Sequence, residues 1–185
     1  MAKNVLRYLN STKELCLCYT ISNQQLQCYS DADWGGDSTD RKSYTGFVFM
    51  FVNSPVSWES EKQHSVALSS TEAEYMAMCA TAKETVYLRK IFKELGLTKY
   101  ISSATILNSD NLSAQELVKN PVYHPRSKHI DIRYHYIRDV YAKNEICLQY
   151  VPTNDMPADI LTKNLTKTKH WKFMTMMGLL CNKLN

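Results

Sequence analysis

No apolar run in this sequence approaches the roughly 18 residues that a membrane-spanning helix needs. The first residues, Met1–Arg7, also contain no apolar core of signal-peptide length. Membrane insertion and export are therefore not indicated, and we expect an intracellular protein without a membrane partner.

The sequence also lacks a recognisable cysteine framework. None of its six cysteines forms a CxxC pair, and no HxxxH stands nearby, so a structural zinc site is not indicated. Scattered thiols without a framework are typical of proteins in a reducing compartment, which agrees with an intracellular location.

Repeats, low-complexity linkers and a strong charge imbalance are missing as well. The 185 residues suit one domain with short extensions, and 44% hydrophobic with 22% charged residues is ordinary for a soluble globular chain. The net charge of +4 fits a nucleic-acid partner, but many unrelated proteins are as basic, so charge alone does not predict one.

β-Rich segments separated by turn formers predict three strands in the first third of the chain. They are expected at 26–30, 45–52 and 56–58, with a short helix before them at 3–9. A long helix follows, because Ser69–Glu72 fits a capping box and apolar residues recur at helical spacing until Gly96.

After the long helix, strands and helices alternate. We expect strands at 104–107 and 146–150, and helices ending near Lys119, over 130–141, over 156–163 and in the tail. This order predicts an α/β fold. Its mixed five-stranded sheet has three antiparallel strands and then two parallel strands, and helices flank it.

Four acidic residues stand where such a sheet can bring them together. Asp31 closes the first strand, Asp110 follows the fourth, Glu74 lies early in the long helix, and Asp159 begins the helix after strand five. Strand ends of α/β sheets face the crevice where ligands bind. Carboxylates that share a crevice are typical of a magnesium site for phosphoryl chemistry.

Each acid also has a structural explanation. A glutamate early in a helix complements the helix dipole, and an aspartate beside a turn commonly binds its own backbone. Glu72 is explained as the capping-box partner, which is why Glu74 is the preferred candidate. Spacing alone leaves the structural and catalytic interpretations open.

Several motifs in one order resemble the RNase H domain of copia-type (Pseudoviridae-like) LTR retrotransposon Pol polyproteins. The resemblance covers nearly the whole chain, from about Ala2 to Leu180. The motifs are Tyr29–Asp37, Pro55–Trp58, Ala67–Tyr75, Lys128–His135, Tyr150–Thr153 and Ala158–Lys163.

The resemblance implies an RNase H-like fold and endonucleolytic cleavage of the RNA strand of RNA–DNA hybrids. It assigns both catalysis and metal binding to Asp31, Glu74, Asp110 and Asp159, with two Mg2+ ions for which Mn2+ can substitute. One departure is Asn108, where relatives usually carry another small residue. A second is the segment 150–159, which has no histidine, unlike the bacterial and cellular branch of the superfamily.

The resemblance also implies a division of the chain and a set of partners. Residues 1–22 would be a remnant of the segment that connects the reverse transcriptase, 23–165 the RNase H domain, and 166–185 a helical tail. The partners would be an RNA–DNA hybrid and the reverse transcriptase domain of the same polyprotein, in a cytoplasmic virus-like particle or the nucleus. A polyprotein fragment, a decayed element and a host gene derived from one all fit this sequence.

Two groups of polar residues are candidates for substrate contacts, although a solvated surface explains each about equally well. The first follows Asp31 in a turn-rich loop, where it could touch the RNA backbone, and the second could hold phosphates of the DNA strand. The candidates are Arg41, Lys42, Ser43, Asn111, Arg126, Lys128, His129 and Arg133.

Two other functions are alternatives to an active ribonuclease H. A domesticated or inactive domain could bind hybrids or proteins without cutting, but all four acids are present. An integrase or resolvase of the same fold is disfavoured, because integrases place the glutamate on a late helix, whereas Glu74 precedes Asp110.

Overall fold

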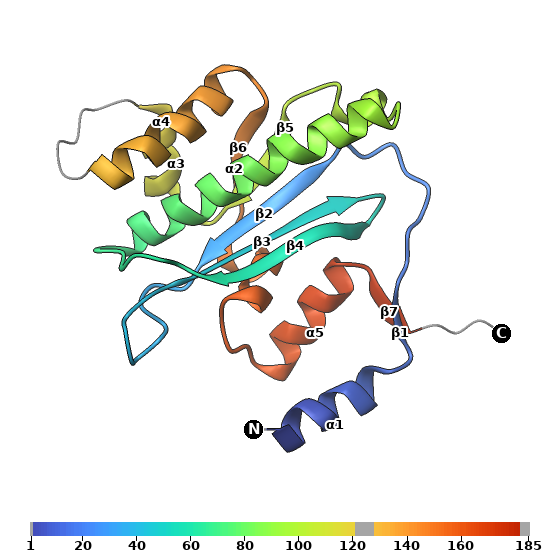
Figure 1. Ribbon diagram of the computed structural model, residues 1–185. Coiled ribbons are helices and arrows are strands. Elements are labelled where there is room, and N and C mark those ends of the chain that lie inside the picture. The colour runs from blue at the N-terminus through green and yellow to red at the C-terminus, as the bar shows by residue number, and fades with distance from the viewer. Residues whose placement is uncertain (1, 121–127, 182–185) are drawn as a thin grey trace.

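A mixed five-stranded sheet forms the centre of the protein (Figure 1). The computed structural model describes residues 2–120 and 128–181. The strands lie in the order β4-β3-β2-β5-β6; their bounds are β2 Gln27–Ala32, β3 Tyr44–Phe51, β4 Ser54–Lys62, β5 Thr105–Ser109 and β6 Ile146–Tyr150. The pairs β2–β3 and β3–β4 are antiparallel, while β2–β5 and β5–β6 are parallel. The predicted sheet is therefore confirmed.

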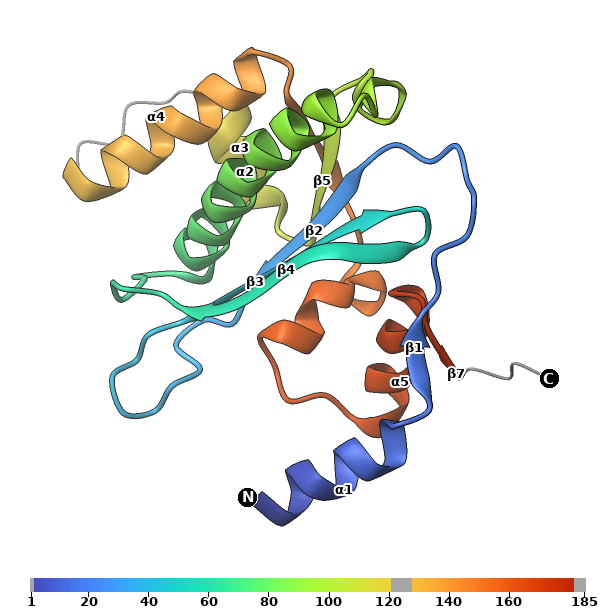
Figure 2. The same ribbon diagram turned by 45° about the vertical axis from the view of Figure 1, so that its right-hand side comes forward.

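Three α-helices cover one face of this sheet (Figures 1 and 2). They are α2 Ser70–Glu94, α3 Leu112–Lys119 and α4 Lys128–Ala142, and the turn η1 Thr98–Ile101 follows α2. Aromatic and aliphatic side chains fill the layer between the helices and the sheet, among them the fully buried Phe49, Met78 and Leu107. Burial of this apolar surface holds α2 against the sheet and so fixes where its first turns lie relative to the strands.

The predicted capping box at the start of α2 is present. The Ser69 hydroxyl accepts a hydrogen bond from the Glu72 amide (3.1 Å), and the Glu72 carboxylate accepts one from the Leu68 amide (2.8 Å). These bonds satisfy backbone donors that a helix start leaves unpaired, so the sequence alone determines where α2 begins.

The opposite face of the sheet carries a smaller layer. It contains the two turns η2 Thr153–Asp155 and η3 Pro157–Leu161, and the helix α5 Lys167–Met176. The helix α1 Ala2–Thr12 lies beside α5 in both views (Figures 1 and 2). Val48 and Met50 of the sheet pack against Met177 here, so this layer has its own small core.

The two ends of the described chain meet in a second sheet that the sequence did not predict. Strand β1 Leu15–Leu17 pairs antiparallel with β7 Leu179–Cys181, and the Cys18 amide donates to the Gly178 carbonyl (3.1 Å). The proposed division at residues 22 and 166 stays a prediction. No helix in the described part of the chain is long and apolar enough to cross a membrane.

Candidate active site

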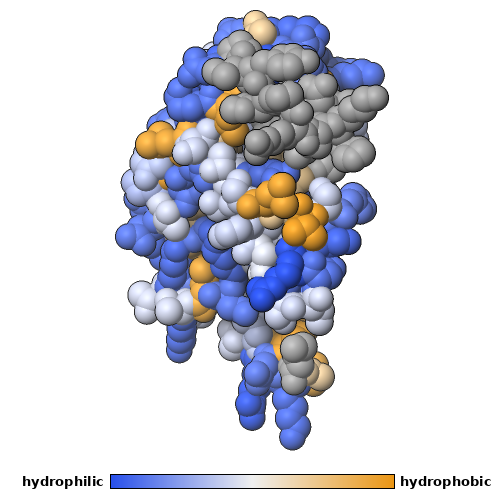
Figure 3. All heavy atoms as spheres, turned by 90° about the vertical axis from the view of Figure 1, so that its left-hand side faces the viewer, coloured by the Kyte–Doolittle hydropathy of each residue, from blue (hydrophilic) through white to orange (hydrophobic). Residues whose placement is uncertain are grey.

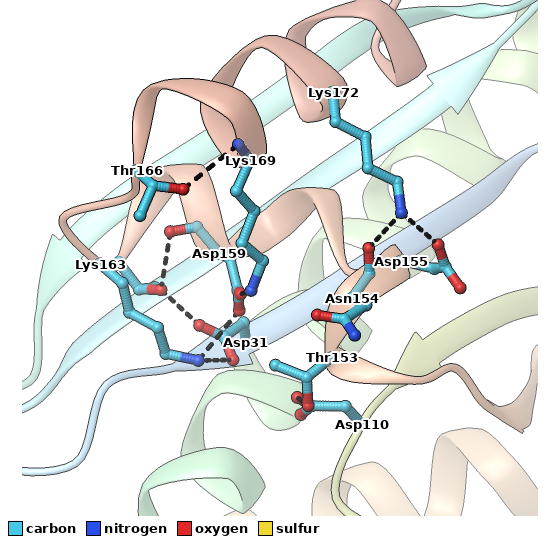
Figure 4. A network of polar contacts seen from close by, with 11 residues as sticks. Asp31, Asp110, Thr153, Asn154, Asp155, Asp159, Lys163, Thr166, Lys169 and Lys172 are labelled. Atoms are coloured by element: carbon cyan, nitrogen blue, oxygen red, sulfur yellow. Dashed lines mark hydrogen bonds and ion pairs between the residues drawn. The ribbon is translucent and has the colours of Figure 1, made fainter.

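The acidic residues meet at one edge of the sheet. Asp31 lies on β2 and Asp110 directly follows β5; because these strands are parallel neighbours, their carboxyl ends reach the same edge. Asp159 comes from η3 on the other side of β2 (Figure 4). One carboxylate oxygen from each of these three residues lies within 4.8 Å of the other two.

Glu74 is the fourth predicted acid, and α2 places it beside this group. Its side chain is buried, and the Ala32 amide donates a hydrogen bond to it. Among the described residues, no group hydrogen-bonds to its Oε2 atom. Burial, with the nearby charges of Asp31 and Asp110, raises the pKa of Glu74 to about 9. This carboxyl therefore holds a proton at neutral pH in the protein alone.

Lysines and a threonine from the following segment contact two of the acids. The Lys163 Nζ atom lies 2.8 Å from Asp31 Oδ1 and 2.9 Å from Asp159 Oδ1. The Lys169 Nζ atom lies 2.6 Å from Asp159 Oδ2, and the Thr162 hydroxyl donates to Asp31 Oδ2. Both aspartates have fully buried side chains, whereas the two lysines are partly exposed.

These contacts set the charge state of the group. Burial raises the pKa of Asp31, and Lys163 and Thr162 act in the opposite direction. Burial also works against the Lys163 ammonium, but attraction by Asp31 and Asp159 holds the pKa of Lys163 above its ordinary value. Lys163 is therefore a cation within the acidic group.

A glycine in β3 allows η3 to approach the sheet. Gly46 pairs with Asp31 across the β2–β3 ladder. A Cβ atom at Gly46 would lie 2.6 Å from Thr162 Cγ2 and 2.9 Å from Leu161 Cβ, both closer than van der Waals contact permits. The absence of a side chain at Gly46 thus permits the approach that places Asp159 beside Asp31.

Asp110 and the predicted contact Asn111 end β5 and begin α3. The Thr153 hydroxyl donates to Asp110 Oδ2 (2.6 Å), and Asp110 is half-buried. The Asn111 side-chain oxygen caps α3 by accepting from the Ala114 amide (2.9 Å). Asn111 is therefore near the acids, and its substrate contact stays a prediction.

The remaining predicted substrate contacts lie in different settings. Arg41 is exposed and Lys42 half-buried in the loop after β2, but Ser43 is fully buried and accepts a hydrogen bond from the Gly35 amide (3.0 Å). That bond gives Ser43 a structural role in the loop. Arg126 lies outside the described residues, and for Lys128, His129 and Arg133 only the backbone in α4 is described.

Lys163, Lys169, Thr162 and Gly46 were not predicted as parts of the site. The sequence does contain a signal for Lys163. It follows Asp159 by four positions, a spacing that places two side chains side by side after one helical turn. The position of Lys169 depends on how α5 packs, which the local sequence does not show.

The donor set fits a divalent cation. Carboxylate oxygens are hard ligands of the kind that Mg2+ and Mn2+ prefer. The buried Glu74 Oε2, which has no hydrogen-bond partner among the described residues, is a further oxygen available to such an ion.

Comparison with known proteins gives relatives along nearly the whole chain. The chain is 42% identical over 180 residues to the retrovirus-related Pol polyprotein from transposon TNT 1-94 of Nicotiana tabacum, covering 97% of this chain and 13% of the relative. It is 38% identical to the corresponding polyprotein from transposon RE1 of Arabidopsis thaliana, covering 96% and 12%. No protein-family model matches the chain.

Solved structures show the same fold. LC11-RNase H1, isolated from compost by a metagenomic approach, matches with a TM-score of 0.55 and 14% identity over 75% of this chain and 93% of that one. The same protein in complex with an RNA/DNA hybrid matches with a TM-score of 0.54 and 13% identity over 75% and 94%.

The chain therefore has an RNase H-like fold, with three acidic residues gathered at the strand ends. Among proteins of this fold, the chain is homologous to one segment of the Pol polyproteins of copia-type plant transposons, so the predicted resemblance is confirmed. The chain spans about an eighth of the length of these relatives.

Proposed function

We propose that this chain is a metal-dependent ribonuclease H that hydrolyses the RNA strand of RNA–DNA hybrids. The observation that carries the proposal is the convergence of Asp31, Asp110 and Asp159, with oxygens within 4.8 Å of one another at the strand ends. Glu74 is a buried carboxyl beside these three aspartates. A group of this composition at a ligand-binding edge is suited to phosphodiester hydrolysis without a covalent nucleophile.

The four acids would hold two Mg2+ ions, or Mn2+ in their place. When bound, such ions supply an activated water and stabilise the leaving oxygen. The chain's own residues hold the acids in position: β2 and β5 fix Asp31 and Asp110, while Thr153 and Thr162 orient their carboxylates through hydrogen bonds. Glu74 would release its proton as it becomes a ligand, because only the carboxylate form binds a cation well.

The comparisons support the choice of substrate. A structural neighbour has been solved in complex with an RNA/DNA hybrid, and the relatives are Pol polyproteins of transposons. We therefore propose a role in retrotransposon reverse transcription, with the reverse transcriptase domain of the same polyprotein as partner. The strand ends with the acids lie toward the left in Figure 1, and outside the grey atoms that side is mainly hydrophilic with small separate hydrophobic patches (Figure 3). Such a surface suits a nucleic-acid backbone.

The decisive experiment is cleavage of an RNA–DNA hybrid labelled on the RNA strand, with and without Mg2+. We expect wild type to cut only with Mg2+, and Asp110→Asn to slow cleavage by about 100-fold or more while hybrid binding persists. Asp155→Asn is the matched control, because Asp155 is half exposed, pairs with Lys172 and lies outside the acidic group. It should change the rate by less than about twofold.

A different outcome would support the alternative function, a domain that binds hybrids without cutting them. If folded wild type binds the hybrid but leaves it intact with both Mg2+ and Mn2+, the chain is a binding domain and not a nuclease. Equal cleavage by wild type and Asp110→Asn would show that the catalytic centre lies elsewhere.

A further inference from the structure

Each carboxylate oxygen of Asp31 and Asp159 accepts a hydrogen bond from another side chain of the protein. Asp31 receives Lys163 on Oδ1 (2.8 Å) and the Thr162 hydroxyl on Oδ2. Asp159 receives Lys163 on Oδ1 (2.9 Å) and Lys169 on Oδ2 (2.6 Å). Figure 4 shows both ammonium groups directed at these carboxylates, that of Lys163 from just after η3 and that of Lys169 from α5.

The two lysines provide the positive charge that pairs with the two buried carboxylates. Buried charges are strongly destabilising unless they are paired, and the side chains of Asp31 and Asp159 are both fully buried. Two ammonium groups carry the same total charge as one divalent cation, and they contact the oxygens that such a cation would use. A metal ion between these carboxylates would therefore meet a like charge within a few ångströms, which is strongly unfavourable.

We propose that Lys163 and Lys169 are built-in counter-cations that a divalent metal must displace from Asp31 and Asp159. This inference rests on the proposed metal site and adds a competitor that sets its affinity. In the protein alone the lysines hold the two aspartates together. When a metal binds, they leave.

The structure provides room for this displacement. The Lys163 side chain is 34% exposed and that of Lys169 is 26% exposed, so neither ammonium has to cross the core to reach solvent. Lys163 also lines an open cavity of about 350 Å³, together with Asp33, Tyr44, Ser60 and Asn164. The displaced Lys163 ammonium can occupy this cavity at the edge of the site, where it would attract the phosphates of a nucleic acid.

The test is Mn2+ binding measured by calorimetry, together with thermal unfolding in EDTA and in Mn2+. Lys163→Met removes the charge while keeping a long side chain, and Lys163→Arg keeps the charge. Lys172→Met is the matched control, because Lys172 lies on α5 near Lys169 but pairs with Asp155 (2.7 Å) outside the acidic group. Lys169→Met is a second test variant that leaves Asp31 and its partners unchanged.

We expect Lys163→Met to bind Mn2+ about tenfold more tightly than wild type, within the range usual for coupled binding events. In EDTA its unfolding temperature should fall, and Mn2+ should raise that temperature by more than it does for wild type. Lys169→Met should show the same changes to a smaller extent. Lys163→Arg and Lys172→Met should bind Mn2+ as wild type does.

Binding by Lys163→Met and Lys169→Met that is equal to or weaker than that of wild type would overturn the inference while leaving the proposed metal site intact. If neither wild type nor any variant binds Mn2+, the metal site itself is refuted and the inference falls with it. Binding by the lysine variants but not by wild type would support displacement most strongly.

Discussion

Two parts of the acidic site differ in how their carboxyl groups are surrounded: Asp31 with Asp159, and Glu74 with Asp110. Asp31 and Asp159 are fully buried, and lysines and a threonine occupy all their carboxylate oxygens. Glu74 is equally hidden, but it receives a backbone amide, has an oxygen without a hydrogen-bond partner among the described residues, and has a pKa of about 9. Asp110 is half-buried and receives the Thr153 hydroxyl. Asp31 and Asp159 are therefore neutralised by ion pairs, and Glu74 is neutralised by a proton.

The carboxyl groups of this cluster should therefore change the stability of the folded chain in opposite directions when each is substituted by an amide. Removal of one carboxylate from these ion pairs destabilises the folded chain, because it leaves partly buried lysines without their partners. A buried carboxyl without a cation opposes folding at any pH where it would ionise in the unfolded chain. Substitution of each carboxylate by an amide separates these two effects.

Asp159→Asn is expected to have the largest effect on the metal-free protein. It removes the shared partner of Lys163 and Lys169, so the free energy of unfolding in EDTA should fall by about 3 kcal/mol, the lower end for a broken buried pair because both lysines are partly exposed. Urea denaturation measures the change, with the exposed Asp155→Asn as control. A loss no larger than that of the control would mean that the lysine contacts do not stabilise the fold.

Gly46→Ala should move Asp159 away from Asp31 by displacing η3. The added Cβ overlaps Thr162 Cγ2 and Leu161 Cβ, so we expect a loss of about 2 kcal/mol, typical of overpacking, and weaker Mn2+ binding. The double variant Gly46→Ala with Thr162→Ser removes one overlapping methyl group and keeps the hydroxyl that donates to Asp31. It should recover part of the stability. Unchanged stability in the single variant would contradict the role assigned to Gly46.

Glu74→Gln should have a smaller effect of the opposite sign, and one that depends on pH. The pKa of Glu74 is about 9 in the folded protein and close to its ordinary value of 4.5 in the unfolded chain. Between these values the folded state binds the extra proton, so wild-type stability falls as pH rises. Glu74→Gln lacks this loss, so in EDTA it should be more stable than wild type by at least about 1 kcal/mol at pH 8 and about equal near pH 4.5. Parallel stability–pH curves for the two proteins would exclude the raised pKa.

Parts of the fold and site could be read from local sequence. The start of α2 followed from Ser69 and Glu72, because a capping box involves only neighbouring residues. Asp31 and Asp110 were expected to meet because each stands at a strand end facing the ligand-binding crevice. That β2 and β5 are parallel neighbours was decided by the fold. Glu74 and Asp159 were candidates from their places near helix starts, and the motifs resembling copia-type domains assigned them a role in catalysis and metal binding.

Other parts depended on contacts between distant segments. The pairing of β1 with β7 was not predicted, because each strand has only three residues and gains its stability from the other. Ser43 was predicted as a substrate contact from its loop position, yet the fold buries it against Gly35. The close approach at Gly46 was also not visible, because a glycine in a strand does not reveal which segment lies above it.

The sequence by itself determined the order of the five central strands and the main helices, the helix start at Ser69 and the presence of four acids at strand ends and helix starts. Periodicity, capping and turn formation are local effects, which explains why these features could be derived without a structure. Only the tertiary structure decided that Lys163 would meet Asp31, 132 positions away, and that Glu74 would form no ion pair among the described residues. The charge state of a buried group depends on the groups that folding brings around it, and that environment exists only in the folded chain.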